Sequence, residues 1–397
     1  MKYFINFFLI FSFLIGCSSN TTDSKNKDHI IKHIKIYASH DEYCAWPAMI
    51  RAANGDLLVT FCINEEHLGP DGKIAMARST DNGKTWDKPE IIYDTPIDDR
   101  HVGLTLLKDG SIITHCWSTF WDSKKYRDLP AKAYEKEMIG RWCEHVDKLE
   151  YKEAEKYQGQ WSRTSLDNGK TWSKNRPGKD SIHGGLQLQN GTLVVASYRL
   201  DEGHVGVYSA QSPETPWEKI ATVYCPTPDS LRFGEPHILQ LSSGRIIMMI
   251  RATAKPYNDL DSRCYLWGTY SDDNGKIWAA PYQTPIWGYP PHLLQLSDGR
   301  ILCTYGYRRP PFGQRACISE DGITWKKENE IILRDDAYNK DLGYPVSVEL
   351  EPGTVLSVYY QPDPSDGSQM MEPPDPKRSR PDILGTIWKV PDMEKPE

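Results

Sequence analysis

The segment from Trp46 to Leu58 reads WPAMIRAANGDLL, which is an apolar run, a polar turn containing Gly55 and a second apolar run. Two apolar runs joined by an Asn-Gly turn are typical of a β-hairpin, because both turn residues adopt positive φ readily. Five further segments repeat this pattern, and their turn glycines are Gly110, Gly191, Gly244, Gly299 and Gly353.

The spacing of these hairpins predicts the architecture. Successive turn glycines lie about 54 residues apart, except that about 81 residues separate Gly110 from Gly191. A period near 50 residues is typical of propeller blades, each of which needs neighbours to bury its faces. We therefore predict an all-β chain in which six blades close into one ring over residues 30–397. Closure is expected to pair residues 33–38 with residues 385–390.

The long interval contains a different kind of sequence. Residues 123–160 include AKAYEKEMIGRWCEHVDKLEYKEAEKY, which is rich in helix-forming residues. We expect a helical insertion at the edge of a blade. It either decorates the surface or forms a lid or wall of the functional site.

Composition excludes several classes of protein. The 397 residues are 25% charged and 39% hydrophobic, which indicates a folded protein and not a disordered or multi-span membrane one. Forty-seven basic and 54 acidic residues give a net charge of −7, without a basic cluster. Nucleic acid is therefore not an expected partner. Thirteen Trp and 22 Tyr suit packed blades or surfaces that stack on sugars.

The first residues indicate export. A short apolar run from Phe4 to Ile15 precedes Gly16-Cys17, as in a bacterial lipoprotein signal, with an ordinary secretory signal as the alternative. We expect residues 1–17 to end at a lipidated Cys17 and residues 18–29 to be a tether. The protein would then be anchored to the cell envelope, at the outer membrane or periplasmic face, through this lipid alone.

The other eight cysteines carry no metal-ligand or CxxC spacing, so we interpret them as buried small apolar residues, with one or two disulfides possible. They are Cys44, Cys62, Cys116, Cys143, Cys225, Cys264, Cys303 and Cys317.

A second motif recurs in phase with the hairpins. The pattern S-x-D-x-G-x-x-W occurs at Ser79–Trp86, Ser165–Trp172 and Ser271–Trp278, with a shorter copy at Ser319–Trp325 and a weak relic ending at Trp217. Asp and Ser side chains can bond turn amides, Gly accepts a strained backbone, and Trp packs between strands. The motif therefore predicts structure, and no catalytic role is expected for Asp81, Asp167 or Asp273.

These boxes resemble the Asp-boxes of the sialidase (neuraminidase) superfamily, whose BNR repeats form a six-bladed β-propeller. The resemblance extends over most of the mature chain. It implies a carbohydrate-active protein whose substrate is an acidic oligosaccharide or polysaccharide.

The repeats also align a ring of side chains. Innermost strands of a propeller run in the same direction, so equivalent positions lie at one mouth of the central channel. The residues nine positions before each turn glycine differ in all six repeats, which favours a site over a structural ring; they are Trp46, His101, Ile182, Glu235, Pro290 and Tyr344. Neighbouring positions add Arg100, His183, His237, Tyr289 and His292. A single His at such a position is more often a structural hydrogen-bonding residue, whereas four of them together weaken that interpretation.

The sialidase resemblance assigns roles to some of these residues. In that family a Glu supports a nucleophilic Tyr, and Glu235 and Tyr344 occupy the matching places. Family arginines that clamp a substrate carboxylate correspond to Arg251 and to Arg308 or Arg309. The family's acid/base Asp lies in a loop that here reads Asn64-Glu65-Glu66-His67, so Glu65 or Glu66 is expected to replace it.

One departure concerns the first blade. The family's Arg-Ile-Pro is Ala45-Trp46-Pro47 here, so the first clamp arginine is absent. Losing a buried ionic donor costs about 2 to 5 kcal/mol, which argues against ordinary sialic-acid hydrolysis. Arg51 lies within the strand, whereas Arg100 in the second blade is placed to compensate.

Three functions remain open at this point. The first is an exo-acting glycosidase with Tyr344 and Glu235 as the nucleophile pair and Glu65 or Glu66 as the acid. The second is a lyase or dehydratase on a uronic-acid glycan of plant or algal (ulvan-like) type, with His101 or Tyr344 as the base. The third is a non-catalytic glycan-binding lipoprotein. No nucleotide, flavin or metal motif is visible, so no cofactor is expected.

Overall fold

Six antiparallel sheets succeed one another along the chain in the computed structural model, which describes residues 28–39, 41–130, 134–198, 203–258, 261–363 and 380–391. Each sheet is one blade, and the innermost strands of neighbouring blades contact each other. The predicted six-bladed β-propeller is thereby confirmed. The expected signal peptide, Cys17 and the tether up to residue 27 lie outside the described residues.

The first three blades contain the following strands. Blade one consists of β2 (Tyr43–Arg51), β3 (Leu57–Asn64), β4 (Lys73–Ser79) and β5 (Glu90–Tyr93). Blade two consists of β6 (Asp98–Leu106), β7 (Ile112–Thr119), β8 (Gly159–Ser162), β9 (Thr164–Ser165) and β10 (Arg176–Pro177). Blade three consists of β11 (Leu186–Gln187), β12 (Leu193–Ser197), β13 (Val205–Ala210) and β14 (Glu218–Val223).

The second half of the ring is more regular. Blade four consists of β15 (Leu231–Gln240), β16 (Ile246–Ala254), β17 (Tyr265–Ser271) and β18 (Tyr282–Trp287). Blade five consists of β19 (Pro291–Gln295), β20 (Ile301–Tyr307), β21 (Gly313–Ser319) and β22 (Glu330–Arg334), with a short 3-10 turn at Lys327–Asn329. Blade six consists of β23 (Gly343–Glu351), β24 (Thr354–Gln361), β25 (Asp382–Lys389) and β1 (Ile30–Tyr37).

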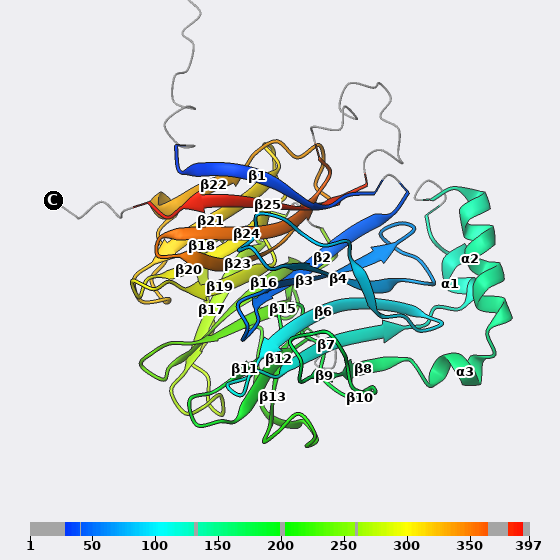
Figure 1. Ribbon diagram of the computed structural model, residues 1–397, viewed down its shortest axis with the longest axis horizontal. Coiled ribbons are helices and arrows are strands. Elements are labelled where there is room, and N and C mark those ends of the chain that lie inside the picture. Colours follow the sequence, from blue (N-terminus) through cyan, green and yellow to red (C-terminus); the bar gives the residue numbers. More distant parts are fainter. Residues whose placement is uncertain are drawn as a thin grey trace, which may run out of the picture.

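The ring closes by pairing the first strand with the last. β1 lies antiparallel to β25, with His33 opposite Thr386 and Ile34 opposite Gly385, as the sequence predicted (Figure 1). The His33 ring nitrogen and the Thr386 hydroxyl lie 3.0 Å apart across this pair. The outermost strand of blade six therefore comes from the opposite end of the chain.

The Asp-boxes are turns between the third and fourth strands of their blades. In the first box Asp81 Oδ1 accepts from the amides of Lys84 and Thr85 at 3.0 and 2.9 Å, and Ser79 Oγ accepts from the amide of Gly83. The hydroxyl and amide of Thr85 hold the pKa of Asp81 down to about 2. Both Asn82 and Gly83 have positive φ, so the strain is shared by two residues and not carried by glycine alone.

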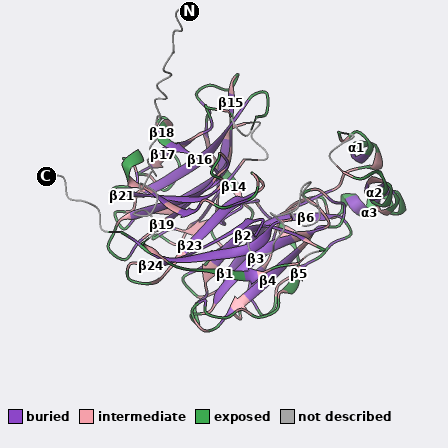
Figure 2. Ribbon diagram, turned by 90° about the horizontal axis from the view of Figure 1, so that it is seen from above, coloured by how far each residue is buried: buried purple, intermediate pink, exposed green. Residues whose placement is uncertain are grey.

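The predicted insertion is helical and lies at the edge of blade two. It contains α1 (Ser123–Arg127), α2 (Lys136–Lys148) and α3 (Tyr151–Glu155). Met138, Trp142 and Val146 recur at helical spacing on α2 and are buried against Tyr126 of α1. Figure 2 shows these helices beside the sheets, separate from the main core. No helix in the described part of the chain is both long and apolar enough to cross a membrane.

The cysteines of the blades and insertion are buried, as expected for small apolar residues. No disulfide joins any of the eight that the structure describes.

The innermost strands approach each other so closely that some positions admit only glycine. A Cβ added to Gly103 of β6 would lie 2.1 Å from the Ser181 carbonyl oxygen and 2.2 Å from the Gly184 amide nitrogen. Both contacts are to backbone, so they cannot be relieved by a rotamer change. Gly140 on the exposed face of α2 has open space around it.

We expect Gly103→Ala to lower the free energy of unfolding by about 1–3 kcal/mol, the range for overpacked sites. Gly140→Ala is the matched control and is expected to be neutral or stabilising by up to about 1 kcal/mol, because Ala is the better helix former. Chemical denaturation of both variants checks this. Equal stability of the two variants would contradict the close approach of blades two and three.

Candidate functional site

Four blades carry a strained residue at the ring position that the repeats defined. Trp46, His101, Glu235 and Tyr344 have φ of 56°, 51°, 45° and 51°. Each one lies at a break in register of the innermost hairpin of its blade, where the pairing skips residues. A bulge of this kind re-aims a side chain out of the regular alternation of the strand, and such bulges are frequent beside functional sites.

The two remaining ring positions differ. Ile182 precedes β11 and Pro290 precedes β19, and neither has positive φ. Both lie outside the cavity described below. The ring of six predicted from the repeats is therefore a set of four at the site.

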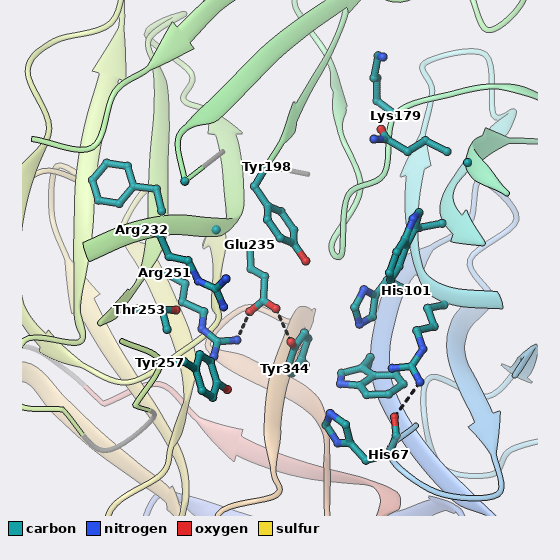
Figure 3. A pocket seen from close by; sticks show the side chains of 18 of the residues that line it. His67, His101, Lys179, Tyr198, Arg232, Glu235, Arg251, Thr253, Tyr257 and Tyr344 are labelled. Atoms are coloured by element: carbon teal, nitrogen blue, oxygen red, sulfur yellow. Dashed lines mark hydrogen bonds and ion pairs between the residues drawn. The ribbon is translucent and has the colours of Figure 1, made fainter. Parts of the chain in front are cut away.

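Tyr344, Glu235 and Arg251 form one chain of hydrogen bonds. The Tyr344 hydroxyl donates to Glu235 Oε1 at 2.5 Å, and Arg251 Nη1 donates to Glu235 Oε2 at 2.5 Å (Figure 3). The three side chains come from β23, β15 and β16, and all are less than a tenth exposed. Both oxygens of the carboxylate are thus engaged, which fixes its orientation toward the phenol.

Burial and neighbouring charges shift the pKa values of Tyr344 and Arg251 in this chain of hydrogen bonds. Burial and the Glu235 carboxylate raise the pKa of Tyr344 well above its ordinary value, while Arg251 opposes this shift. Although burial opposes its charge, Glu235 and Tyr344 raise the pKa of Arg251. The resting chain is therefore a neutral phenol donating to a carboxylate that is paired with a guanidinium. The phenol becomes nucleophilic when Glu235 takes its proton.

Arg251 and Arg308 lie over the same aromatic ring. Their guanidinium carbons are 4.3 and 5.3 Å from the centre of the Tyr289 ring. Arg308 is further held by its Nε donating to the Leu342 carbonyl oxygen at 3.0 Å. Tyr289 does not line the cavity, so its contribution is a platform beneath two cationic groups.

The opposite wall is formed by blades one and two. His101 packs edge-on to Trp46 at 5.0 Å between ring centres and parallel to Tyr344 at 6.1 Å. Arg100 lies 5.0 Å from the centre of the Trp46 ring, forms an ion pair with Asp98 and donates to the His67 carbonyl oxygen. Trp46 thus gives the first blade an aromatic wall at the cavity.

These walls enclose a cavity of about 1280 Å³. Typical small-molecule sites occupy roughly 300–1,000 Å³, so there is room for more than one sugar unit. Seven cationic side chains line the cavity against two carboxylates, Glu235 and Asp341. The seven are Arg100, Lys179, Arg232, Arg251, Lys255, Arg308 and Lys340. A chain of net charge −7 therefore presents a cationic cavity, which favours an anionic ligand.

The expected acid is not where the loop after β3 suggested. Glu65 accepts hydrogen bonds from Arg141 and from Trp142 Nε1 of α2, and Glu66 forms an ion pair with Arg380 at 2.7 Å. Neither glutamate lines the cavity. Basic and indole donors from distant segments hold both carboxylates, so the structure does not bring either expected acid to the lining of this cavity.

Four further residues also lie elsewhere. Arg309 stacks on Trp287 at 3.6 Å outside the cavity, so of the Arg308 and Arg309 alternatives only Arg308 lines it. His183, His237 and His292 form a buried cluster with ring centres 4.4 to 5.3 Å apart, and none of them lines the cavity. In the described residues no group of His, Cys or carboxylate side chains is arranged to hold a metal ion.

Several lining residues were missed from the sequence. His67 and Asp341 come from the loops before β4 and β23, Tyr198 and Arg232 from blades three and four, and Gln160 from the end of the insertion. The alignment of the repeats identifies only residues of the innermost strands, whereas most of these residues lie in loops or at strand ends. His67 adjoins the two glutamates that were singled out, which is the one signal that pointed to it. Of the described residues of the insertion, those after α3 contribute to the wall of the cavity.

The histidine cluster makes a prediction about acid stability. Burial lowers the pKa of His237 to about 3, and it also lowers those of His183 and His292. The unfolded chain then binds more protons than the folded chain below about pH 6.5, so stability falls as the pH decreases. Each such histidine contributes a loss of about 2 kcal/mol by pH 5.

The variant His237→Asn keeps an acceptor for the Leu293 amide, which now bonds His237 Nδ1 at 2.8 Å. We expect its unfolding free energy to decline less steeply than that of the native protein between pH 6.5 and pH 5. Guanidinium denaturation at several pH values measures the two slopes. Parallel slopes would show that His237 is not neutral in the folded state.

Comparison with known proteins places this geometry in context. A sequence profile described as a BNR repeat-like domain matches residues 142–364, which is more than half of the chain. No curated protein matches the chain significantly.

Solved structures match over most of the ring. A protein of unknown function from Dyadobacter fermentans superposes with a TM-score of 0.71 at 22% identity, covering 91% of this chain and 99% of that one. The NanB sialidase of Streptococcus pneumoniae gives 0.61 at 13% identity, covering 89% and 70%. The intramolecular trans-sialidase of Ruminococcus gnavus gives 0.59 at 13% identity, covering 90% and 97%.

At these identities the structural matches show a shared fold, and the profile match shows common descent of the repeats. Together with the Asp-boxes and the six blades, they establish that this chain belongs to the BNR repeat-like family of sialidase-type six-bladed propellers.

Proposed function

We propose that the protein is a glycoside hydrolase that acts on a glycan bearing a carboxylate sugar, with Tyr344 as nucleophile and Glu235 as its base. The observation that carries this proposal is the 2.5 Å hydrogen bond from Tyr344 to Glu235 at the wall of a cationic cavity. A buried Tyr–Glu–Arg chain is costly unless every member is satisfied, so its place beside a large cavity favours chemistry over a structural role.

A tyrosine suits an anionic sugar. The phenol is neutral until it reacts, so it meets no charge repulsion from a substrate carboxylate, unlike an aspartate or glutamate nucleophile. As the bond from Tyr344 Oη to the anomeric carbon forms and the bond from that carbon to the glycosidic oxygen breaks, the phenolic proton passes to Glu235 Oε1. Arg251 donates to the other oxygen of Glu235, which keeps Oε1 directed at the phenol.

Arg251 and Arg308 support recognition of the carboxylate. They lie side by side over Tyr289, and guanidinium groups match carboxylates through paired hydrogen bonds. Sialidase and trans-sialidase activities are named for two of the structural neighbours, which agrees with a glycan substrate. Ala45 stands where the family has its first clamp arginine, so we propose a carboxylate sugar other than an ordinary sialic acid.

Elimination from a uronic acid is a second candidate, favoured by one observation. His101 packs against Tyr344 at the wall of a cavity that neither Glu65 nor Glu66 lines. His101 or Tyr344 would remove the C5 proton while arginines neutralise the carboxylate.

Incubation with a panel of sialylated, rhamnosylated and uronate-containing oligosaccharides separates the candidates. Hydrolysis gives new reducing ends without ultraviolet absorbance, whereas elimination gives an unsaturated uronate that absorbs in the ultraviolet. Binding without either product would leave a glycan-binding protein. We expect reducing ends alone.

Replacing Tyr344 by Phe removes only the hydroxyl and keeps the packing of the ring. We expect kcat to fall by about 10² or more, the usual scale of such contributions, with little change in Tm. Tyr305→Phe is the matched control, because the Tyr305 hydroxyl donates to Glu330 at 2.5 Å in a buried site outside the cavity. Equal activity of the two variants on the cleaved oligosaccharide would remove Tyr344 from the mechanism.

Replacing Arg308 by Lys keeps the charge and removes the planar pair of donors. We expect kcat/KM for the carboxylate substrate to fall by about 10²-fold, since a hydrogen bond to a charged group contributes about 1.5–3 kcal/mol. Arg309→Lys changes a neighbouring arginine that stacks on Trp287 outside the cavity and is expected to leave kcat/KM within twofold. Steady-state kinetics compare the two variants, and an equal loss of kcat/KM in both would contradict binding of the substrate carboxylate by Arg308.

A further inference from the structure

Cleavage of a glycoside requires a proton for the departing oxygen, and the cavity offers few carboxyl groups for this. The lining carboxylates are Glu235, which is engaged by Tyr344 and Arg251, and Asp341. Both oxygens of Asp341 accept from the Tyr43 hydroxyl at 2.9 Å, and Oδ1 also accepts from Tyr360 at 3.2 Å. Although burial acts against it, His67 and Arg308 lower the pKa of Asp341, so this carboxylate holds no proton to give.

His67 lies next to this carboxylate with its ring in a fixed orientation. Its Nδ1 is 2.7 Å from the Tyr43 hydroxyl oxygen and 3.5 Å from Asp341 Oδ1. The ring packs edge-on against Tyr43 and Trp46 at 5.4 and 5.2 Å between centres. The main chain is held as well, because the His67 carbonyl oxygen accepts from Arg100 Nη2 at 2.9 Å.

The hydrogen-bond directions assign the proton on this ring. The Tyr43 hydroxyl gives its hydrogen to Asp341, so its oxygen accepts from Nδ1–H of His67. The chain thus runs from His67 through Tyr43 to Asp341. Nε2 lies at the other side of the ring, on a side chain that is 47% exposed at the cavity wall (Figure 3). Among the described residues no hydrogen-bond partner is recorded for Nε2.

His67 also lines the same cavity as the proposed nucleophile. Trp46 separates it from His101, which packs on Tyr344. On the other side Tyr360 donates to Asp341 and lies 5.8 Å from Tyr344 between ring centres. A sugar bound at Tyr344 would therefore have His67 at the edge of the same cavity, one aromatic ring away.

We propose that His67, oriented by Tyr43 and Asp341 and carrying hydrogen on both ring nitrogens as the imidazolium, is the proton donor to the leaving oxygen, in place of a carboxylic acid. This rests on the hydrolase function proposed above. As Tyr344 Oη bonds to the anomeric carbon, the bond from that carbon to the leaving oxygen breaks, and its electron pair takes the proton from Nε2. Neutral His67 then accepts a proton from water, whose oxygen bonds to the anomeric carbon, while Tyr344 departs and recovers its proton from Glu235. The sum is one glycoside and one water converted into a hemiacetal sugar with a free reducing end and the alcohol that leaves.

The test compares leaving groups. The probes are the carboxylate oligosaccharide cleaved in the panel and the 4-methylumbelliferyl glycoside of the same terminal sugar, whose phenol departs without protonation. We expect His67→Gln to lower kcat/KM by about 10² to 10⁴ on the oligosaccharide and less than tenfold on the aryl glycoside. Added azide is expected to raise aryl-glycoside turnover by the variant. Activity on the aryl glycoside also shows that the variant is folded.

His145→Gln is the matched control, since His145 lies on α2 and contacts the Pro96 carbonyl oxygen outside the cavity. It is expected to retain native rates on both probes. Equal losses on both probes for His67→Gln, or no loss on either, would overturn the role of His67 while Tyr344→Phe still loses both activities. Native rates for Tyr344→Phe, or hydrolysis of neither probe by the native protein, would overturn the hydrolase function and this inference with it.

Discussion

One backbone constraint underlies the site: four innermost strands each place a residue with φ near +50° at a break in register. A non-glycine residue in this conformation costs roughly 1–2 kcal/mol, and the packed ring imposes it four times. In regular strands the alternation of faces would bury the side chain of Glu235 or Tyr344 between blades. The bulges instead turn both toward one cavity, so that two strands far apart in sequence share a hydrogen bond.

The sequence was most informative where structure is local. Hairpin turns such as Asn54-Gly55 and the boxes around Asp81 are closed by neighbours within a few residues, so their spacing alone predicted six blades and the placement of Glu235 and Tyr344. The loop after β3 was different. Which of Glu65, Glu66 and His67 faces the cavity depends on Trp142 and Arg380, and no local pattern encodes contacts over such separations.

The cavity carries the opposite charge to the protein as a whole. The protein is acidic overall, whereas its cavity gathers seven cationic side chains around two carboxylates. Tyr289 stabilises part of this positive charge, since the face of its ring lies beneath both Arg251 and Arg308. The first blade adds no Arg or Lys to the lining, since Ala45 stands where the family has an arginine and Trp46 contributes an aromatic wall beside it. The preference for an anion is thereby shifted toward blades four to six.

The contacts of the loop from Glu65 to His67 affect how the propeller begins to unfold. Its three residues bind three different parts of the chain: Glu65 binds the insertion, Glu66 binds Arg380 just before β25, and His67 meets Asp341 before β23. The loop therefore bridges the seam at which the first blade meets the last. If Arg380 and β25 separate from blade six, the loop loses its ion pair through Glu66, whereas the sheets of the other blades stay intact. Loss of the site would then report the first opening of the ring, well before the blades themselves melt.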